Sequence, residues 1–291
     1  MSDSLLFLLI QILNGVQYGL LLFLVASGLT LIFGIMGIIN LAHGSFYMLG
    51  AYLAFAFAEA TGSLWLAMAI AVPLTFVIGL ALEAGLFRFL YARDHLYQVL
   101  LTYGLILVFE ELRALIFGND VHGVPVPSFL NFSIPLTKTL SYPAYRLALS
   151  AICLIVAGLL YVLIQRTRLG MAIRAGSMNR EMVQSLGIDI GMLYRVVFAL
   201  GVTLAALAGM LAAPTTSVFP GMGDQILIIC FVTVVIGGIG SIKGAFFGAM
   251  LIGLADTFGA VYAPRLSGMV VYMLMAAVLI WRPAGLFGRA T

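Results

Sequence analysis

The stretch INLAHGSFYMLGAYLAF, residues 39–55, interrupts a long apolar region with two polar side chains, Asn40 and His43, followed directly by Gly44. The next Asp, Glu, Lys or Arg along the chain is Glu59. A polar side chain within a long apolar segment is costly unless it faces protein or water. We therefore expect a break between two helices here.

The composition of the whole chain places this break in a membrane protein. Of the 291 residues, 63% are hydrophobic and only 9% are charged, and the mean hydropathy is +1.17. A soluble domain carries about 25% charged residues, because its surface faces water. Repeated apolar runs of about 20 residues, enough to cross a ~30 Å hydrocarbon core, predict an all-α polytopic membrane protein. The first run lacks a basic leader and a cleavage site, so we expect a retained span rather than a signal peptide.

The apolar runs predict a single transmembrane domain over residues 1–291, with broken or short helices among its spans. The predicted spans are 5–33, 44–61, 65–88, 98–117, 143–164, 193–213, 224–238, 244–258 and 268–281. The spans 224–238 and 244–258 are short for full crossings, and 25–44 could hold a broken helix. We therefore expect eight to ten crossings.

Basic side chains predict the orientation, because those near span ends are retained in the cytoplasm. Ten of the fourteen Lys and Arg residues fall on one predicted side: Arg88, Arg93, Arg166, Arg168, Arg174, Arg180, Arg195, Lys243, Arg282 and Arg289. The other four are Arg113, Lys138, Arg146 and Arg265. This predicts a cytoplasmic C-terminus and an external N-terminus, and an additional crossing near 25–44 would reverse only the N-terminus.

Two polar segments connect the predicted spans. Residues 118–142 carry Pro125, Pro127 and Pro135 and are expected to form an external loop. Residues 165–192 are the longest charged stretch on the cytoplasmic side. Their apolar residues recur in a loosely helical pattern, which predicts one or two short amphipathic helices at the membrane surface.

The sequence holds no pattern for catalysis, for a cofactor or for a metal. A P-loop needs Ser or Thr after its Gly-Lys pair, whereas in GGIGSIKGA (237–245) Lys243 follows Ile and precedes Gly244. Cys153 and Cys230 lie within apolar runs and are expected to act as small hydrophobic residues. We expect a non-enzymatic protein, so any ATP that drives it must be hydrolysed by another subunit.

Glycines and charges within the spans predict how the helices pack. Gly240, Gly244 and Gly248 form two consecutive G-x-x-x-G steps, a spacing that aligns bare backbone on one helix face. Packing within the chain is favoured over a dimer interface, because the motif is common. Among the charges, Glu83 is expected to pair with Arg88, about a turn away. No chain of buried acidic and histidine residues emerges, which argues against a proton-coupled pump.

The most specific motif lies in the cytoplasmic stretch. REMVQSLGI (180–188) keeps the spacing of the E-A-A-x-x-x-G element of permease subunits in ATP-binding-cassette importers, with Glu181 at the acidic position and Gly187 at the glycine. Met182 and Val183 replace the two alanines, and the I-x-L-P continuation is missing. A short helix with a glycine at its exit suits a coupling element that presents a rigid knob to an ATPase. A plain loop whose charges serve topology is the alternative.

Three segments together resemble the branched-chain amino-acid permease family of ATP-binding-cassette importers. They keep the family's order along nearly the whole chain: GLTLIFGIMGIINLAHGSFYMLGAY (28–52), RTRLGMAIRAGSMNREMVQSLGI (166–188) and GGIGSIKGAFFGAMLIGL (237–254). The resemblance implies a fold like that of the larger, type II importer permeases. By matched position it implies an ATPase-coupling region at Gly170, Arg174, Asn179, Arg180, Glu181 and Gly187.

The resemblance also implies a function and an assembly. The chain would be a permease of the bacterial inner membrane that moves branched-chain amino acids by alternating access. A sister permease, two cytoplasmic ATPase subunits and a periplasmic binding protein would complete the transporter. ATP-Mg would bind the ATPase subunits, so no cofactor is expected on this chain. Nucleic acid is not expected as a partner. Relatives with a similar pattern carry urea, short amides or broader sets of amino acids. A stand-alone secondary transporter is the less favoured alternative.

Two interpretations of the break remain open within this reading. Asn40, His43 and Gly44 could line the translocation path and hydrogen-bond the cargo. Alternatively, Asn40 caps the following helix and His43 bonds a neighbouring carbonyl at the cytoplasmic interface, so that the segment acts as a hinge. The predicted topology, which puts the break near that interface, favours the hinge.

Overall fold

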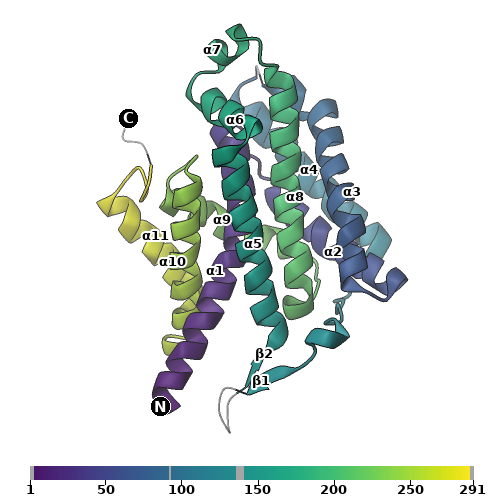
Figure 1. Cartoon of the computed structure of the whole chain (residues 1–291), viewed down its shortest axis with the longest axis vertical. Helices are drawn as coiled ribbons and strands as arrows, with labels where there is room; N and C mark the ends of the chain where they lie inside the picture. Colours follow the sequence, from purple (N-terminus) through teal and green to yellow (C-terminus); the bar gives the residue numbers. More distant parts are fainter. Residues whose placement is uncertain (1–2, 92, 136–140, 289–291) are drawn as a thin grey trace.

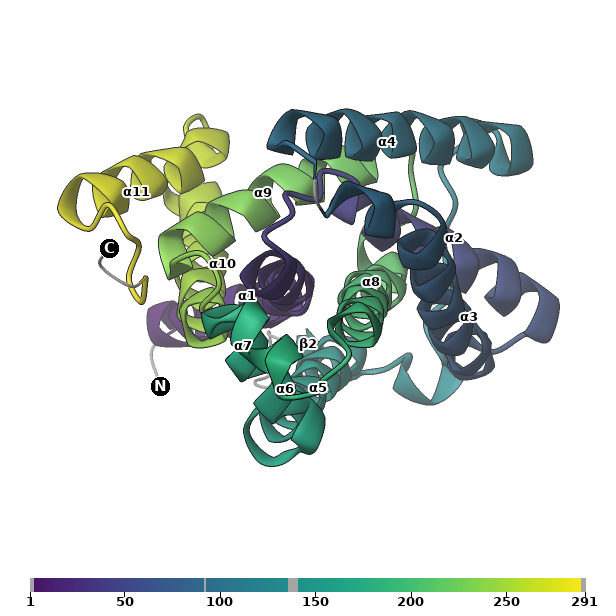
Figure 2. The ribbon, with the colours of Figure 1, turned by 90° about the horizontal axis from the view of Figure 1, so that it is seen from above.

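The uncharged N-terminal run forms one continuous helix, α1 (Asp3–Met36), in the computed structural model, which describes residues 3–91, 93–135 and 141–288. Its 34 residues extend about 51 Å at 1.5 Å per residue, more than the ~30 Å thickness of a hydrocarbon core. In its most apolar window, 89% of the residues are buried inside the protein. Helix α1 is therefore a central helix, and Figure 2 shows other helices around its upper part.

Each of the other predicted spans also corresponds to one helix. These are α2 (His43–Thr61), α3 (Leu64–Gly85), α4 (His95–Phe117), α5 (Ala144–Arg166), α8 (Ile190–Thr216), α9 (Met222–Gly237), α10 (Ile242–Tyr262) and α11 (Ser267–Trp281). Within the described residues, α1, α3, α5, α8 and α10 are long and apolar enough to cross a membrane, while α9 and α11 are shorter apolar helices. The all-α polytopic fold class is confirmed.

The charged stretch that is expected on the cytoplasmic side folds into two short helices, as its pattern predicted. Helix α6 (Arg168–Met178) follows α5 after a single residue, and α7 (Arg180–Ser185) follows α6 in the same way. Figure 1 shows both at one end of the bundle, opposite the N-terminus. A further short turn, the 3₁₀ helix η1 (Phe87–Leu90), joins α3 to α4.

The two ends of the bundle differ in charge. Among the described residues, the basic side chains that the sequence predicts to be cytoplasmic lie at the α6–α7 end. Arg166 closes α5, Lys243 opens α10 and Arg282 follows α11. Arg289 and Lys138, two further residues used for the orientation, lie outside the described residues.

The expected external loop contains some local structure. A 3₁₀ turn, η2 (Ser128–Leu130), precedes an antiparallel pair of strands, β1 (Ser133–Pro135) and β2 (Ser141–Pro143). Strands of three residues are too short to leave a periodic pattern, so the sequence did not reveal them. The hairpin is tied to α1, because the Tyr142 hydroxyl donates a hydrogen bond to Oδ1 of Asn14 at 3.2 Å.

The centre of the bundle is formed where α8 packs on both α1 and α2. Glycines permit these contacts, since a Cβ on Gly28 of α1 would lie 2.5 Å from the carbonyl oxygen of Gly201 in α8. A Cβ on Gly50 of α2 would likewise clash with the backbone of Ala206 in α8. The three helices therefore approach backbone to backbone, as membrane helices with small residues at their contacts do.

Candidate functional site

The break between α1 and α2 covers residues 37–42. Helix α1 ends just before Gly37, whose φ of +67° is a left-handed value that glycine adopts without strain. Oδ1 of Asn40 then accepts a hydrogen bond from the backbone N–H of Ala42 at 3.1 Å. Asn40 is 0% exposed, and its Nδ2 has no partner among the described residues. The expectation that Asn40 caps α2 is therefore wrong: the N-cap position is Ala42, no side chain caps the helix, and Asn40 instead forms a polar turn just before it.

His43 lies deeper in the bundle than the sequence suggested. Its Nε2 donates a hydrogen bond to the backbone carbonyl of Val25 at 2.9 Å, because a carbonyl can only accept. The expected bond to a neighbouring carbonyl is present, and it places the side chain away from the end of α1. Val25 lies eleven residues before Met36, the last residue of α1, and thus about 16 Å along the axis. The side chain is fully buried, and Nδ1 has no partner in the described part of the chain.

Gly44 is the point where the beginnings of α2 and α9 meet. A Cβ at this position would clash with the carbonyl of Gly223 and would lie 2.8 Å from Cβ of Leu227. Both partners belong to the first two turns of α9. Asn40, His43 and Gly44 therefore form one buried group, enclosed by α1 and α9.

Two residues of the expected coupling region hold the corner between α5 and α6. A Cβ on Gly170 would clash with the carbonyls of Leu163 and Ile164, so α6 turns back closely over the end of α5. Arg174 donates a hydrogen bond from Nη1 to the Ile164 carbonyl, one of the last-turn carbonyls that helical N–H groups leave open. Gly170 and Arg174 therefore fix the base of the segment instead of standing at its tip.

The rest of the expected coupling region belongs to α7 and its flanks. Asn179 caps α7, since its Oδ1 accepts from the backbone N–H of Met182 at 3.0 Å. Glu181 lies exposed in the first turn, where the helix dipole stabilises a carboxylate. Gly187 has φ +81° and forms the sharp exit turn that its position suggested.

Arg180 connects α7 to two other parts of the bundle. Its guanidinium lies over the ring of Tyr194 in α8, 5.8 Å from the ring centroid, a distance typical of a cation–π contact. Its Nη2 also lies against the break, only 3.0 Å from where a Cβ on Gly37 would stand. One residue of α7 thus contacts both α8 and the first residue after α1.

A buried cluster continues from Tyr194 into α3. The ring of Tyr194 packs edge to face on that of Tyr91 with centroids 4.9 Å apart, and the Tyr91 hydroxyl donates to a Glu83 carboxylate oxygen. The other oxygen of Glu83 pairs with Nε of Arg195 at 3.2 Å. Burial and the bond to Glu83 raise the pKa of Tyr91 well above its ordinary value, so the phenol stays protonated and donates. The expected pairing of Glu83 with Arg88 is therefore wrong.

Comparison with known proteins identifies the family of this chain. The family described as "Branched-chain amino acid transport system / permease component" matches residues 11–279. The chain belongs to this permease family. The resemblance noted in the sequence is thereby confirmed.

This permease is similar to named transport proteins along nearly its whole length. It is 32% identical to the high-affinity branched-chain amino acid transport system permease protein BraD of Pseudomonas aeruginosa, with 96% of this chain and 95% of BraD covered. It is 30% identical to the corresponding protein LivH of Escherichia coli K12, with 99% and 98% covered. It is 28% identical to the probable branched-chain amino acid transport permease protein LivH of Methanocaldococcus jannaschii, with 96% and 92% covered.

The glycines that were expected to share one helix face in this permease do so in part. A Cβ on Gly244 would clash with Gly237, the last residue of α9, and one on Gly248 would lie 2.7 Å from the Thr233 carbonyl. Both therefore face α9 within the same chain. Gly240 lies in the turn before α10, with φ +80°, and faces Gly34 instead. The helix begins only at Ile242, so the first G-x-x-x-G step is not on a helical face.

Proposed function

We propose that this permease is the membrane subunit of an ATP-binding-cassette importer for branched-chain amino acids in a bacterial inner membrane. The observation that carries the proposal is the full-length similarity to permeases named for that cargo, in both bacteria and an archaeon. The chain itself needs no catalytic site. ATP-Mg would bind two cytoplasmic ATPase subunits, a sister permease would complete the path, and a periplasmic protein would deliver the amino acid.

The orientation proposed for the permease follows the basic residues. The α6–α7 end carries Arg168, Arg174 and Arg180, and Lys and Arg near span ends are retained in the cytoplasm. The N-terminus of α1 and the β1–β2 hairpin lie at the opposite end (Figure 1), which would face the periplasm. The C-terminal segment after α11 would then be cytoplasmic.

The tip of α7 is the part best suited to bind an ATPase subunit. Met178, Met182 and Leu186 expose 72%, 65% and 75% of their surfaces, and Glu181 lies beside them. Flexible methionines and a leucine suit a contact with another protein, and leaving such apolar side chains exposed to water costs free energy. ATP binding would displace this tip, and Arg180 would pass the displacement to α8 and to the break, through its contacts with Tyr194 and Gly37. The cargo then shifts the two states by its difference in affinity for them.

We propose that Asn40, His43 and Gly44 act as a hinge and not as a cargo site. All three are buried, and one ring nitrogen of His43 is already hydrogen-bonded to the carbonyl of Val25. The alanine variants Asn40→Ala and His43→Ala should reduce assembly of the complex, measured by co-purification of the ATPase subunits. Normal assembly with lost uptake would instead assign these side chains to the translocation path.

The experiment that tests the proposed function is uptake into liposomes. The permease, its sister, the ATPase subunits and the binding protein are reconstituted together, and radiolabelled leucine, urea and acetamide are offered in turn. We expect leucine uptake that requires ATP and every subunit. Uptake of urea or acetamide alone would overturn the proposed cargo. Leucine uptake by the permease without ATPase subunits would overturn the proposed class of transporter.

The role of α7 is tested separately by charge reversal. Glu181→Lys should release the ATPase subunits during purification while the permease remains in the membrane. Glu59→Lys makes the same change at an exposed position near the end of α2, on the opposite side of the bundle, and should leave ATPase binding intact. Equal ATPase retention in both variants would contradict the assignment of α7. Arg174→Glu is unsuited to this test, because Arg174 holds the end of α5.

A further inference from the structure

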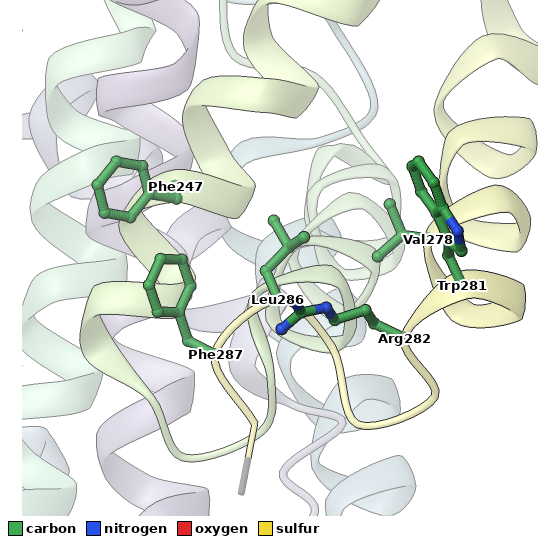
Figure 3. Close-up of a pocket in the computed structure, with 6 residues that line it drawn as sticks. All are labelled: Phe247, Val278, Trp281, Arg282, Leu286 and Phe287. Carbon is green, nitrogen blue, oxygen red and sulfur yellow. The ribbon is translucent and has the colours of Figure 1, made fainter. Parts of the chain in front are cut away.

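A cavity of about 590 Å³ opens between α10, α11 and the segment that follows α11. Figure 3 shows its lining residues converging from these three elements. They are Phe247 from α10, Val278 and Trp281 from α11, and Arg282, Leu286 and Phe287 from the following segment. We call this cavity the Phe247 groove.

The wall formed by the C-terminal segment is fixed to the bundle. The backbone N–H of Leu286 donates to the Ile236 carbonyl at 2.8 Å, and that of Phe287 donates to the Gly237 carbonyl at 3.0 Å. Both acceptors are last-turn carbonyls of α9, which the helix itself leaves open. The Phe287 ring also stacks on that of Phe247 with centroids 5.1 Å apart. The groove is therefore built into the fold.

Helix α11 faces mostly outward and does not close the outer side of this groove. Val271 is its one buried residue among those described, so most of the helix faces outward. Trp281, in its last turn, is 91% exposed. Tryptophan at the end of a membrane helix is typical of the layer where acyl chains meet head groups. The groove thus lies between two apolar helices at the depth of that layer.

The charges around the groove are all of one sign. Arg282 is its one charged lining residue. A second cavity, of about 240 Å³, shares Phe247 with the groove and has Lys243 in its lining. No acidic residue lines either cavity, and Asp256, the acidic residue of α10, lies about 20 Å along the helix axis from Lys243. A guanidinium binds phosphate oxygens in a bidentate fashion, and basic pockets between membrane helices suit lipid head groups.

We propose that the Phe247 groove binds an anionic phospholipid. Its phosphate lies at Arg282 and Lys243, and one acyl chain lies along Phe247, Val278 and Trp281. The occupant is a lipid because the ligand must be apolar within the bilayer and anionic at its edge. The lipid fills the space in which α11 packs poorly on the bundle. This inference requires only that the permease spans a membrane, and it does not depend on the cargo or on the ATPase.

Fluorescence quenching of Trp281 tests the proposal. The assembled transporter is reconstituted in phosphatidylcholine vesicles that contain either brominated phosphatidylglycerol or brominated phosphatidylcholine at equal mole fraction. The Trp281 signal is the difference between the unchanged transporter and the Trp281→Phe variant. We expect brominated phosphatidylglycerol to quench this signal at roughly one tenth of the mole fraction needed with brominated phosphatidylcholine, since two cations face one head group.

Matched variants separate the groove from a general attraction of charge. The double variant Arg282→Gln/Lys243→Gln should quench equally with both lipids. Arg93→Gln, at an exposed position that lines neither cavity, should keep the preference, and inorganic phosphate should not abolish it. Equal quenching by both lipids in the unchanged transporter would overturn the proposal. So would protection of Trp281 from both lipids, which would show that another subunit covers the groove.

Discussion

The pair of Glu83 and Arg195 should make a measurable contribution to the stability of the permease. The Glu83 side chain is 1% exposed and lies 3.2 Å from Nε of Arg195, whose side chain is 42% exposed. At that distance two unit charges attract by about 5 kcal/mol at an effective dielectric constant near 20. Water around the half-exposed arginine screens a large part of this, which leaves about 2 kcal/mol. Arg195→Gln should therefore lower the free energy of unfolding by about 2 to 3 kcal/mol, because it leaves a buried carboxylate with only the Tyr91 hydroxyl.

A double-mutant cycle isolates the pair from other effects. Arg195→Gln, Glu83→Gln and the double variant are unfolded in mixed micelles of dodecylmaltoside and sodium dodecyl sulfate, and the free energies are compared. Glu83→Gln keeps an oxygen that accepts from Tyr91, so the double variant should be about 2 kcal/mol more stable than the sum of the single variants predicts.

Additive effects would refute this reasoning. If the free energies of the two single variants at Glu83 and Arg195 sum to that of the double variant within about 0.5 kcal/mol, the pair contributes nothing, whatever its geometry. The buried cluster would then be held by aromatic packing and by the hydrogen bond from Tyr91 to Glu83.

Four other substitutions should have distinct effects. In Gly79→Ala the new methyl group would lie 2.7 Å from Cα of Ala199, so α3 and α8 must separate by several tenths of an ångström; unfolding in the same micelles should show a loss of about 1–3 kcal/mol. Gly104→Ala, where nothing lies within 4 Å of the new methyl group, should instead add about 0.5–1 kcal/mol in that assay. Arg180→Lys keeps the charge but loses the planar stack on its aromatic partner, so leucine uptake should fall several-fold while ATPase co-purification stays unchanged. Gly187→Ala places a side chain at φ +81°, which costs about 1–2 kcal/mol, and should increase cleavage between α7 and α8 in limited proteolysis.

The helices of this permease could be predicted from its sequence because lipid leaves the backbone no other partner. Each apolar run must satisfy its own N–H and C=O groups, and the helix is the structure that does so within one segment. The break could be located for the same reason, since Asn40 and His43 interrupt the apolar run. The two helices α6 and α7 followed from amphipathic spacing.

The partners of individual side chains could not be predicted. Glu83 pairs with Arg195, 112 positions further along the chain, and local spacing suggested Arg88 instead. Likewise, the sequence places His43 near an interface because the predicted topology puts the break there, whereas its place in the bundle is set by which carbonyl of α1 it meets. Nothing in the sequence singles out Tyr91 and Tyr194, because aromatic residues near span ends are common and no pattern distinguishes those that touch.

The backbone contacts between α2 and α8 limit which parts of the permease can change shape. Where a glycine such as Gly50 or Gly209 meets a neighbouring backbone directly, there are no side-chain rotamers through which the two helices could slide past each other. These two helices should therefore turn together as a single rigid body, with the proposed hinge between them and α1. Helix α4, with only Gln98, Thr102 and Leu105 buried among its described residues, is free to shift against that body at little energetic cost.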